Sequence, residues 1–176
     1  NKLSKSTALH STLIVEDFSS CNYRKKNSNF IVDKGLKILK KNIVFENNYW
    51  KVSASHDGYL KKFGSIHERE IEFYPEEMKF VGFDKILRKD PSKEIKFDIR
   101  FHLNPISKVM KTQDNESILI ELEEEGWKFS CDKYDINIDN SLYLGNKNFI
   151  KENQNIFISG INKEKEQIIK WEISKL

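Results

Sequence analysis

The side chains best suited to recognise a carboxylate are the arginines, because a planar guanidinium can donate two parallel hydrogen bonds to one acid group. They are Arg24, Arg69, Arg88 and Arg100. Arg69 follows His67 by two residues in the alternating segment 65–73, so both side chains should share the face that carries Ile71 and Phe73. A charge on an apolar face needs a partner. Arg69 is therefore either buried against an acidic side chain or backbone carbonyls, or it faces a further domain and helps to position an anionic substrate.

Two other pairs of residues are candidates for ligand contacts. His56 and Tyr59 flank an Asp-Gly turn, and they either pack and hydrogen-bond around it or line the rim of a ligand cleft. Arg100 and His102 alternate with apolar residues in segment 95–103, which places them on the polar face of a strand. That face is either solvated or in contact with substrate. The predicted substrate-binding residues are His56, Tyr59, His67, Arg69, Arg100 and His102.

Strands must position these residues, because alternation with period two dominates the chain. The predicted strands are 12–16, 29–32, 43–45, 50–55, 65–73, 78–86, 95–103, 117–122, 127–131, 142–144, 156–159 and 169–173. Short spacings and glycine turns between them predict an all-β fold, an antiparallel multi-stranded β-sandwich, with residues 1–176 as one unit. Only segment 33–41 resembles a helix, and its lysine-rich composition also fits a hairpin.

Composition excludes several functional classes. The 30 Lys and Arg against 27 Asp and Glu leave a net charge of +3, which indicates a mixed-charge surface and no nucleic-acid partner. No apolar stretch is long enough for a membrane span. Cys21 and Cys131 lack metal-site spacing, and their disulfide state stays open. No nucleophile elbow, phosphate loop or dinucleotide fingerprint is present.

Several segments together resemble the heparinase II/III-like family. Residues 6–17 read STALHSTLIVED, which is similar to the family segment STAxHSTLxVDD. Residues 54–59 read ASHDGY and residues 63–69 read FGSIHER, and both have family counterparts. Residues 100–105 resemble a RFHLHP strand end, except that Asn104 replaces its second histidine. Their order and spacing cover nearly the whole chain.

This resemblance implies the C-terminal part of a polysaccharide lyase, a lyase-type supersandwich that is a fragment of a larger chain. Such enzymes cleave uronate-containing, acidic polysaccharides by β-elimination. The catalytic tyrosine and the carboxylate-neutralising group come largely from an N-terminal helical toroid, so we assign no catalytic residue here and expect the chain alone to be inactive. The family also implies a bacterial, periplasmic location.

The resemblance further implies a metal role for His10. It matches the third ligand of a family metal site whose other ligands, in an HxH and a DSG segment, would lie upstream. A divalent metal, Zn or Ca, is therefore expected in the full-length protein but not in this chain alone, since a stable zinc site needs about three or four protein ligands. The alternative to the lyase reading is a non-catalytic carbohydrate-binding or structural sandwich module.

Overall fold

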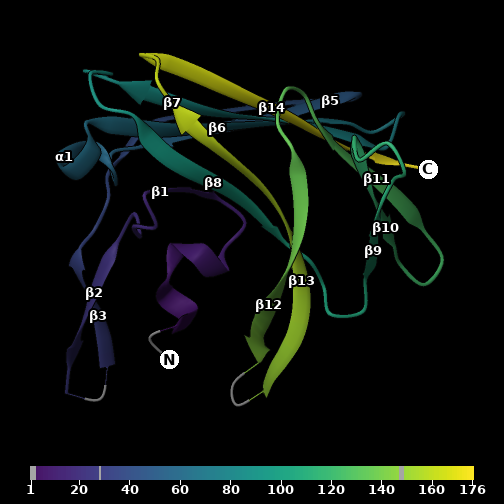
Figure 1. Ribbon diagram of the computed structural model, residues 1–176, viewed down its shortest axis with the longest axis horizontal. Coiled ribbons are helices and arrows are strands. Elements are labelled where there is room, and N and C mark those ends of the chain that lie inside the picture. Colours follow the sequence, from purple (N-terminus) through teal and green to yellow (C-terminus); the bar gives the residue numbers. More distant parts are fainter. Residues whose placement is uncertain (1–2, 28, 147–148) are drawn as a thin grey trace.

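The computed structural model describes residues 3–27, 29–146 and 149–176, which form an all-β sandwich (Figure 1). The larger sheet has eight strands in the order β4-β5-β6-β7-β14-β11-β10-β9. Their bounds are β4 Ile38–Glu46, β5 Tyr49–His56, β6 Ser65–Tyr74, β7 Lys79–Arg88, β14 Glu166–Lys175, β11 Gly126–Cys131, β10 Ser117–Glu121 and β9 Lys108–Lys111. Each neighbouring pair is antiparallel.

A smaller sheet packs against it in the order β1-β8-β13-β12. Its strands are β1 Leu13–Val15, β8 Ile95–His102, β13 Phe149–Asn162 and β12 Ile136–Asn146. In Figure 1 the β12–β13 hairpin extends away from the layer formed by β5, β6, β7 and β14. A separate hairpin pairs β2 Asn22–Lys26 with β3 Asn29–Lys34. The helical parts are the 3₁₀ turns Leu3–Lys5 and Thr7–Leu9 and the four-residue α1, Leu60–Phe63.

The core lies between the two sheets, and alternation decides which residues enter it. On β8 the residues Phe97, Ile99 and Phe101 are buried, whereas the residues between them are not. The Phe101 ring lies 4.8 Å, between ring centroids, from both Phe129 on β11 and Trp171 on β14. Burying each such side chain contributes about 1.5–3 kcal/mol of transfer free energy, which makes this face the main source of stability.

The larger sheet carries a row of aromatic side chains toward its β4 end, on the same face as the core. We call Phe45, Trp50, Phe73 and Phe80 the aromatic row. Successive ring centroids lie 5.0, 5.1 and 4.3 Å apart. The exposed fractions of Phe45 and Trp50 are 75% and 39%, so the smaller sheet does not cover this end of the row.

Every predicted strand overlaps an observed one, and the predicted sandwich is confirmed. The helix considered for segment 33–41 is wrong, because β3 ends at Lys34 and β4 begins at Ile38. The hairpin alternative is also wrong there, since β3 and β4 belong to different sheets. Strands β2 and β9 were not predicted. Both are short, and the Asn-Tyr-Arg-Lys-Lys sequence of β2 has little apolar alternation.

Candidate functional site

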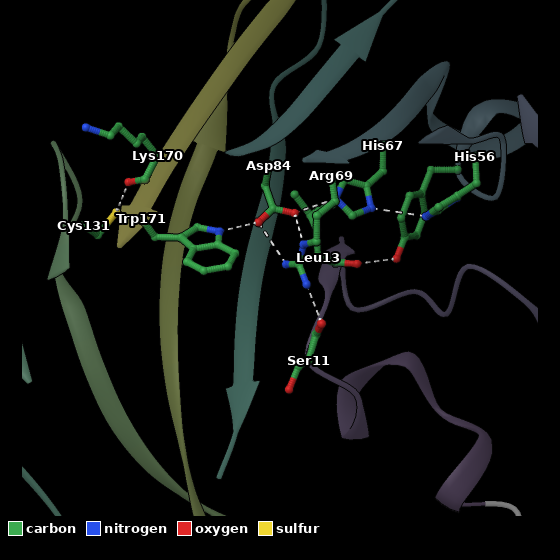
Figure 2. A network of polar contacts seen from close by, with 10 residues as sticks. Ser11, Leu13, His56, His67, Arg69, Asp84, Cys131, Lys170 and Trp171 are labelled. Carbon is green, nitrogen blue, oxygen red and sulfur yellow. Dashed lines mark hydrogen bonds and ion pairs between the residues drawn. The ribbon is translucent and has the colours of Figure 1, made fainter. Parts of the chain in front are cut away.

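The polar centre of the molecule is the Asp84 carboxylate, which is fully buried on β7 (Figure 2). It accepts hydrogen bonds from Nε and Nη2 of Arg69, each 2.9 Å long. His67 Nε2 lies 2.6 Å from one carboxylate oxygen, and Trp171 Nε1 donates to the other at 2.9 Å. Four donors thus compensate one desolvated charge, which is the condition for burying it without a large penalty.

A chain of two histidines leads away from this carboxylate. The Gly58 backbone N–H donates to His56 Nδ1 at 3.2 Å, so that nitrogen carries no proton. Neutral His56 then carries its proton on Nε2 and donates it to His67 Nδ1, 3.2 Å away. His67 in turn donates from Nε2 to Asp84. One consistent set of tautomers therefore follows from a single backbone donor.

Strand register brings these side chains together. His56 on β5 pairs directly with His67 on β6, and Arg69 pairs directly with Asp84 on β7. Trp171 on β14 faces Gly82, where an added Cβ would lie 2.0 Å from the indole ring. The absence of a side chain at Gly82 is what lets the indole lie against β7 and reach Asp84.

The same network holds the N-terminal segment against the larger sheet. Arg69 Nη1 donates to the Ser11 carbonyl, and the Tyr59 hydroxyl donates to the Leu13 carbonyl at 2.8 Å. Only 1% of Tyr59 is exposed. These two carbonyls flank the start of β1, so the side chains that bind them fix the entry of the chain into the smaller sheet.

Burial and neighbouring charges shift the pKa values of Asp84, His56 and Tyr59. Desolvation alone would raise the pKa of the Asp84 carboxyl, but the Arg69 charge and the His67 hydrogen bond outweigh it and hold that pKa well below its usual range. Burial, reinforced by neighbouring His67, lowers the pKa of His56 to about 4. Burial also raises the pKa of the Tyr59 phenol. At neutral pH the network therefore holds an ionised Asp84, a neutral His56 and a neutral Tyr59.

His102 and His10 both bind carbonyls of the N-terminal segment and line one surface hollow. His102 Nε2 donates to the Ala8 carbonyl at 2.9 Å, and the Ser141 hydroxyl lies 3.0 Å from His102 Nδ1. Burial lowers the pKa of His102. His10 is exposed and donates to the Ser4 carbonyl at 3.2 Å.

Arg100 lies on the outer face of the smaller sheet among polar partners. Its guanidinium donates to Asn155 Oδ1 at 3.2 Å and pairs with Asp98 at 3.4 Å. It also lies over the Phe157 ring, 5.3 Å from the centroid. The prediction that Arg100 and His102 lie on the polar face of their strand is confirmed.

The structure thus brings His56, Tyr59, His67 and Arg69 together, and it leaves Arg100, His102 and His10 apart from them. Arg69 has both the acidic partner and the backbone carbonyl that were considered for a buried arginine. The substrate-binding roles of His56, Tyr59, His67, Arg69, Arg100 and His102 stay predictions. Asp84 and Trp171, the other two members of the network, were not singled out from the sequence. A carboxylate two residues before buried Ile86 was the available signal for Asp84.

Each ring nitrogen of His56, His67 and His102 has a hydrogen-bond partner within the chain. Among the described residues, no three His, Cys, Asp or Glu side chains converge as metal ligands. Both cysteines are free thiols. No helix in the described ranges is long and apolar enough to cross a membrane.

Solved structures share this fold. The chain superposes with a TM-score of 0.76 on a mutant of the heparan sulfate lyase HepC from Pedobacter heparinus, at 12% identity, covering 99% of this chain and 25% of that one. A heparinase III gene product matches with a TM-score of 0.69, also at 12% identity, over 99% of this chain and 24% of its own. This chain therefore spans about a quarter of the length of these proteins. A comparison with curated proteins gives no significant match.

The sequence itself matches a family model over residues 1–172, nearly its full length, and that model describes the heparinase II/III-like C-terminal region. The chain therefore belongs to the heparinase II/III-like family and represents its C-terminal domain.

Proposed function

We propose that this chain is the supporting β-sandwich of a polysaccharide lyase that cleaves a uronate-containing polysaccharide by β-elimination. The family match supports a lyase-related module, and this proposal adds the substrate class and the division of labour. In it, the sandwich supplies a rigid platform, and a helical domain outside this chain supplies the catalytic groups. The enzyme would act in the bacterial periplasm.

The observation that carries the proposal is the complete internal use of the buried bases. β-Elimination needs a group that neutralises the uronate carboxylate and a base that removes the adjacent proton. The side chains of His56 and His67 hydrogen-bond to each other, and those of His67 and Arg69 hydrogen-bond to Asp84. Arg69 also donates to the Ser11 carbonyl. The Tyr59 hydroxyl is buried on the Leu13 carbonyl. Residues of the right types are thus present, but they act as structural supports.

The exposed end of the aromatic row is evidence that a second domain packs against this sandwich. The row runs from exposed Phe45 and Trp50 to half-buried Phe73 and Phe80. Exposed Ile43 and Val52 lie on the strands of Phe45 and Trp50. A continuous exposed apolar patch marks an interaction surface. The matched structures are about four times as long as this chain, so we assign the cover of this patch to the remainder of the same polypeptide.

His10 has a place in this proposal as one ligand of a divalent metal. It is exposed directly after the 3₁₀ turn Thr7–Leu9, and among the described residues it belongs to no group of three or more candidate metal ligands. The other ligands would come from outside this chain. The test is metal content by mass spectrometry of the long protein and of its His10→Ala variant, measured beside this chain alone. Equal zinc and calcium in the two long proteins would contradict the role.

The decisive experiment compares this chain with the full-length protein on heparan sulfate, alginate and polyguluronate, following the ultraviolet absorbance of the unsaturated product. We expect activity on one of these polymers from the long protein and none from the chain alone. Turnover by the chain alone would overturn the supporting role. Absence of turnover by a folded, metal-loaded long protein would overturn the lyase assignment.

A second candidate function, favoured by the exposed stacked pair Phe45 and Trp50, is a carbohydrate-binding module, because sugars pack on aromatic faces. The variant Phe45→Ser/Trp50→Ser separates the two. If the row meets another domain, the variant lowers the stability of the long protein. If the row binds sugar, it abolishes polysaccharide binding by this chain and leaves the stability of the long protein unchanged.

A further inference from the structure

Arg88, the last residue of β7, is a buried arginine that forms no ion pair among the described residues, although its charge helps to lower the pKa of the Asp90 carboxyl. Only 8% of it is exposed. Its Nη1 donates to Asn162, at 3.2 Å to Oδ1 and 3.4 Å to the backbone carbonyl. Its Nε is enclosed and has no hydrogen-bond partner. Within the described ranges no carboxylate forms an ion pair with it, which is unusual because a buried charge is costly unless it is paired.

The contacts of Arg69 indicate which group the Nε–Nη2 edge of the Arg88 guanidinium could bind. Both arginines lie on the core-facing side of the larger sheet. In Arg69, Nε and Nη2 form a two-pronged edge that Asp84 occupies at 2.9 Å on each prong. In Arg88 the same edge has no partner among the described residues, since its two hydrogen bonds both start from Nη1. A planar oxyanion is the group that fits such an edge.

A surface hollow of about 550 Å³ lies beside Arg88. Its wall includes Gly64, whose positive φ of 64° ends α1, and the Lys89 backbone N–H donates to the Gly64 carbonyl at 3.2 Å. Lysines from three places in the chain also line it, namely Lys62, Lys89 and Lys93. The hollow is therefore built from the end of α1, the end of β7 and the loop before β8, with Arg88 as its buried member.

Three carboxylates, those of Glu16, Asp90 and Glu94, also line this hollow, and each has a partner of its own. Glu16 accepts from the Lys96 backbone N–H at 2.6 Å, and Asp90 accepts from the backbone and hydroxyl of Ser92. Glu94 pairs with Lys163 at 2.8 Å. In contrast, Lys89 and Lys93 form no ion pair within the described part of the chain. The neutral donors leave the negative charges of Glu16 and Asp90 in place, so the lining has four cationic and three anionic side chains, and the pairing of Glu94 with Lys163 leaves the positive charge in excess.

We propose that Arg88, with Lys62, Lys89 and Lys93, forms a binding site for a single oxyanion, a carboxylate or a sulfate group. The guanidinium holds the oxyanion, and the lysines at the rim draw it in and screen its charge. The site is separate from the Asp84 network and requires no catalysis. Two sources carry this chemistry: a free inorganic anion and an acidic sugar of a polysaccharide. The saccharide source rests on the proposed function, whereas the inorganic source does not.

The test is titration of this chain with sodium sulfate, with glucuronate and with a heparan sulfate tetrasaccharide, at constant ionic strength set by sodium chloride. Binding is followed by ¹H–¹⁵N NMR shifts of residues 62–64 and 88–95. We expect saturable shifts with at least one probe, and affinity at least ten-fold weaker in Arg88→Gln. If the tetrasaccharide binds more tightly than sulfate, the site serves a polysaccharide, and equal affinities assign it to a free anion.

Because Arg88→Gln could impair folding, two further variants that change only exposed lysines test the same site. Lys89→Gln/Lys93→Gln removes rim charges without touching the core, and it should also weaken binding several-fold. The matched control is Lys25→Gln/Lys26→Gln, which removes the same charge from exposed positions of β2 and should leave the affinity unchanged. Equal affinity in all variants, or no saturable shift with any probe, would overturn the proposal, and neither result would bear on lyase activity of the long protein.

Discussion

The Arg69 guanidinium and the Asp84 carboxylate form a two-pronged ion pair between directly opposed residues of β6 and β7. Asp84 is fully buried, and 17% of the Arg69 side chain is exposed. The pair also connects two regions, because Arg69 binds the Ser11 carbonyl and Asp84 binds the Trp171 indole. The N-terminal segment and the two central strands of the larger sheet therefore depend on one charge.

Asp84→Asn should destabilise the chain by about 3–5 kcal/mol, because it leaves Arg69 as a buried charge without its counter-ion. Urea unfolding monitored by circular dichroism measures this as a lower midpoint at unchanged slope. Asp33→Asn is the matched control, since the Arg24–Asp33 pair is exposed at 59% and 53% and should contribute no more than about 1 kcal/mol. Equal midpoints for the two variants would refute the structural importance of the pair.

The stability of the chain should fall as the pH is lowered from 6.5 to 4. The pKa of His56 is lowered from 6.5 to about 4 by burial and by neighbouring His67, so between these values the unfolded chain binds more protons than the folded one. The free energy of unfolding therefore decreases with falling pH across this window. Asp84 adds to this loss only near pH 4, because its carboxyl titrates near 3.8 in the unfolded chain and well below that in the folded one.

Thermal unfolding at several pH values, compared between the wild type and His56→Asn, measures this effect. The asparagine keeps an acceptor for the Gly58 backbone N–H but does not titrate. We expect the melting temperature of the variant to vary less between pH 6.5 and 4 than that of the wild type. Parallel curves for the two proteins would show that another group is responsible.

How far the sequence predicts this molecule can be seen from individual residues. Alternation predicted the strand that carries His67 and Arg69 and the burial of that face, because period two is a local property. It did not identify Asp84 as the partner of Arg69 or Trp171 as its second donor, because the pairing of β7 with β6 and with β14 is set by register between distant segments. The first half of β4 was missed, as β2 and β9 were, and its apolar residues Ile38 and Leu39 are exposed in this chain.

Cys131 should react slowly with alkylating reagents in the folded chain. Burial, together with neighbouring Asp132, raises the pKa of its thiol to about 12, and the thiol donates to the Lys170 carbonyl at 3.3 Å. Because the thiolate is the reactive form, little of it exists near neutral pH. In a Cys21→Ser background, iodoacetamide labelling followed by mass spectrometry should be at least ten-fold slower than in urea. Similar rates in both conditions would contradict the burial of this thiol.

Gly82→Ala should be among the most damaging small substitutions in the chain. Its new Cβ would lie 2.0 Å from the Trp171 ring, so the indole must move away from β7 and lose its bond to Asp84. Overpacking of this kind costs about 1–3 kcal/mol, and the loss of a donor to a buried charge adds to it. Denaturant unfolding gives the cost, and a shift in tryptophan fluorescence reports the displaced indole.

Two comparisons make that prediction specific. Gly126→Ala is the control, since its nearest atom would be the flexible Leu176 side chain at 3.3 Å, and its effect should stay within about 0.5 kcal/mol. Combining Gly82→Ala with Trp171→Phe should cost less than the sum of the single changes, because the smaller ring relieves the clash and the Asp84 bond is lost only once. Strictly additive costs would mean that the contact between Gly82 and Trp171 does not limit packing at this position.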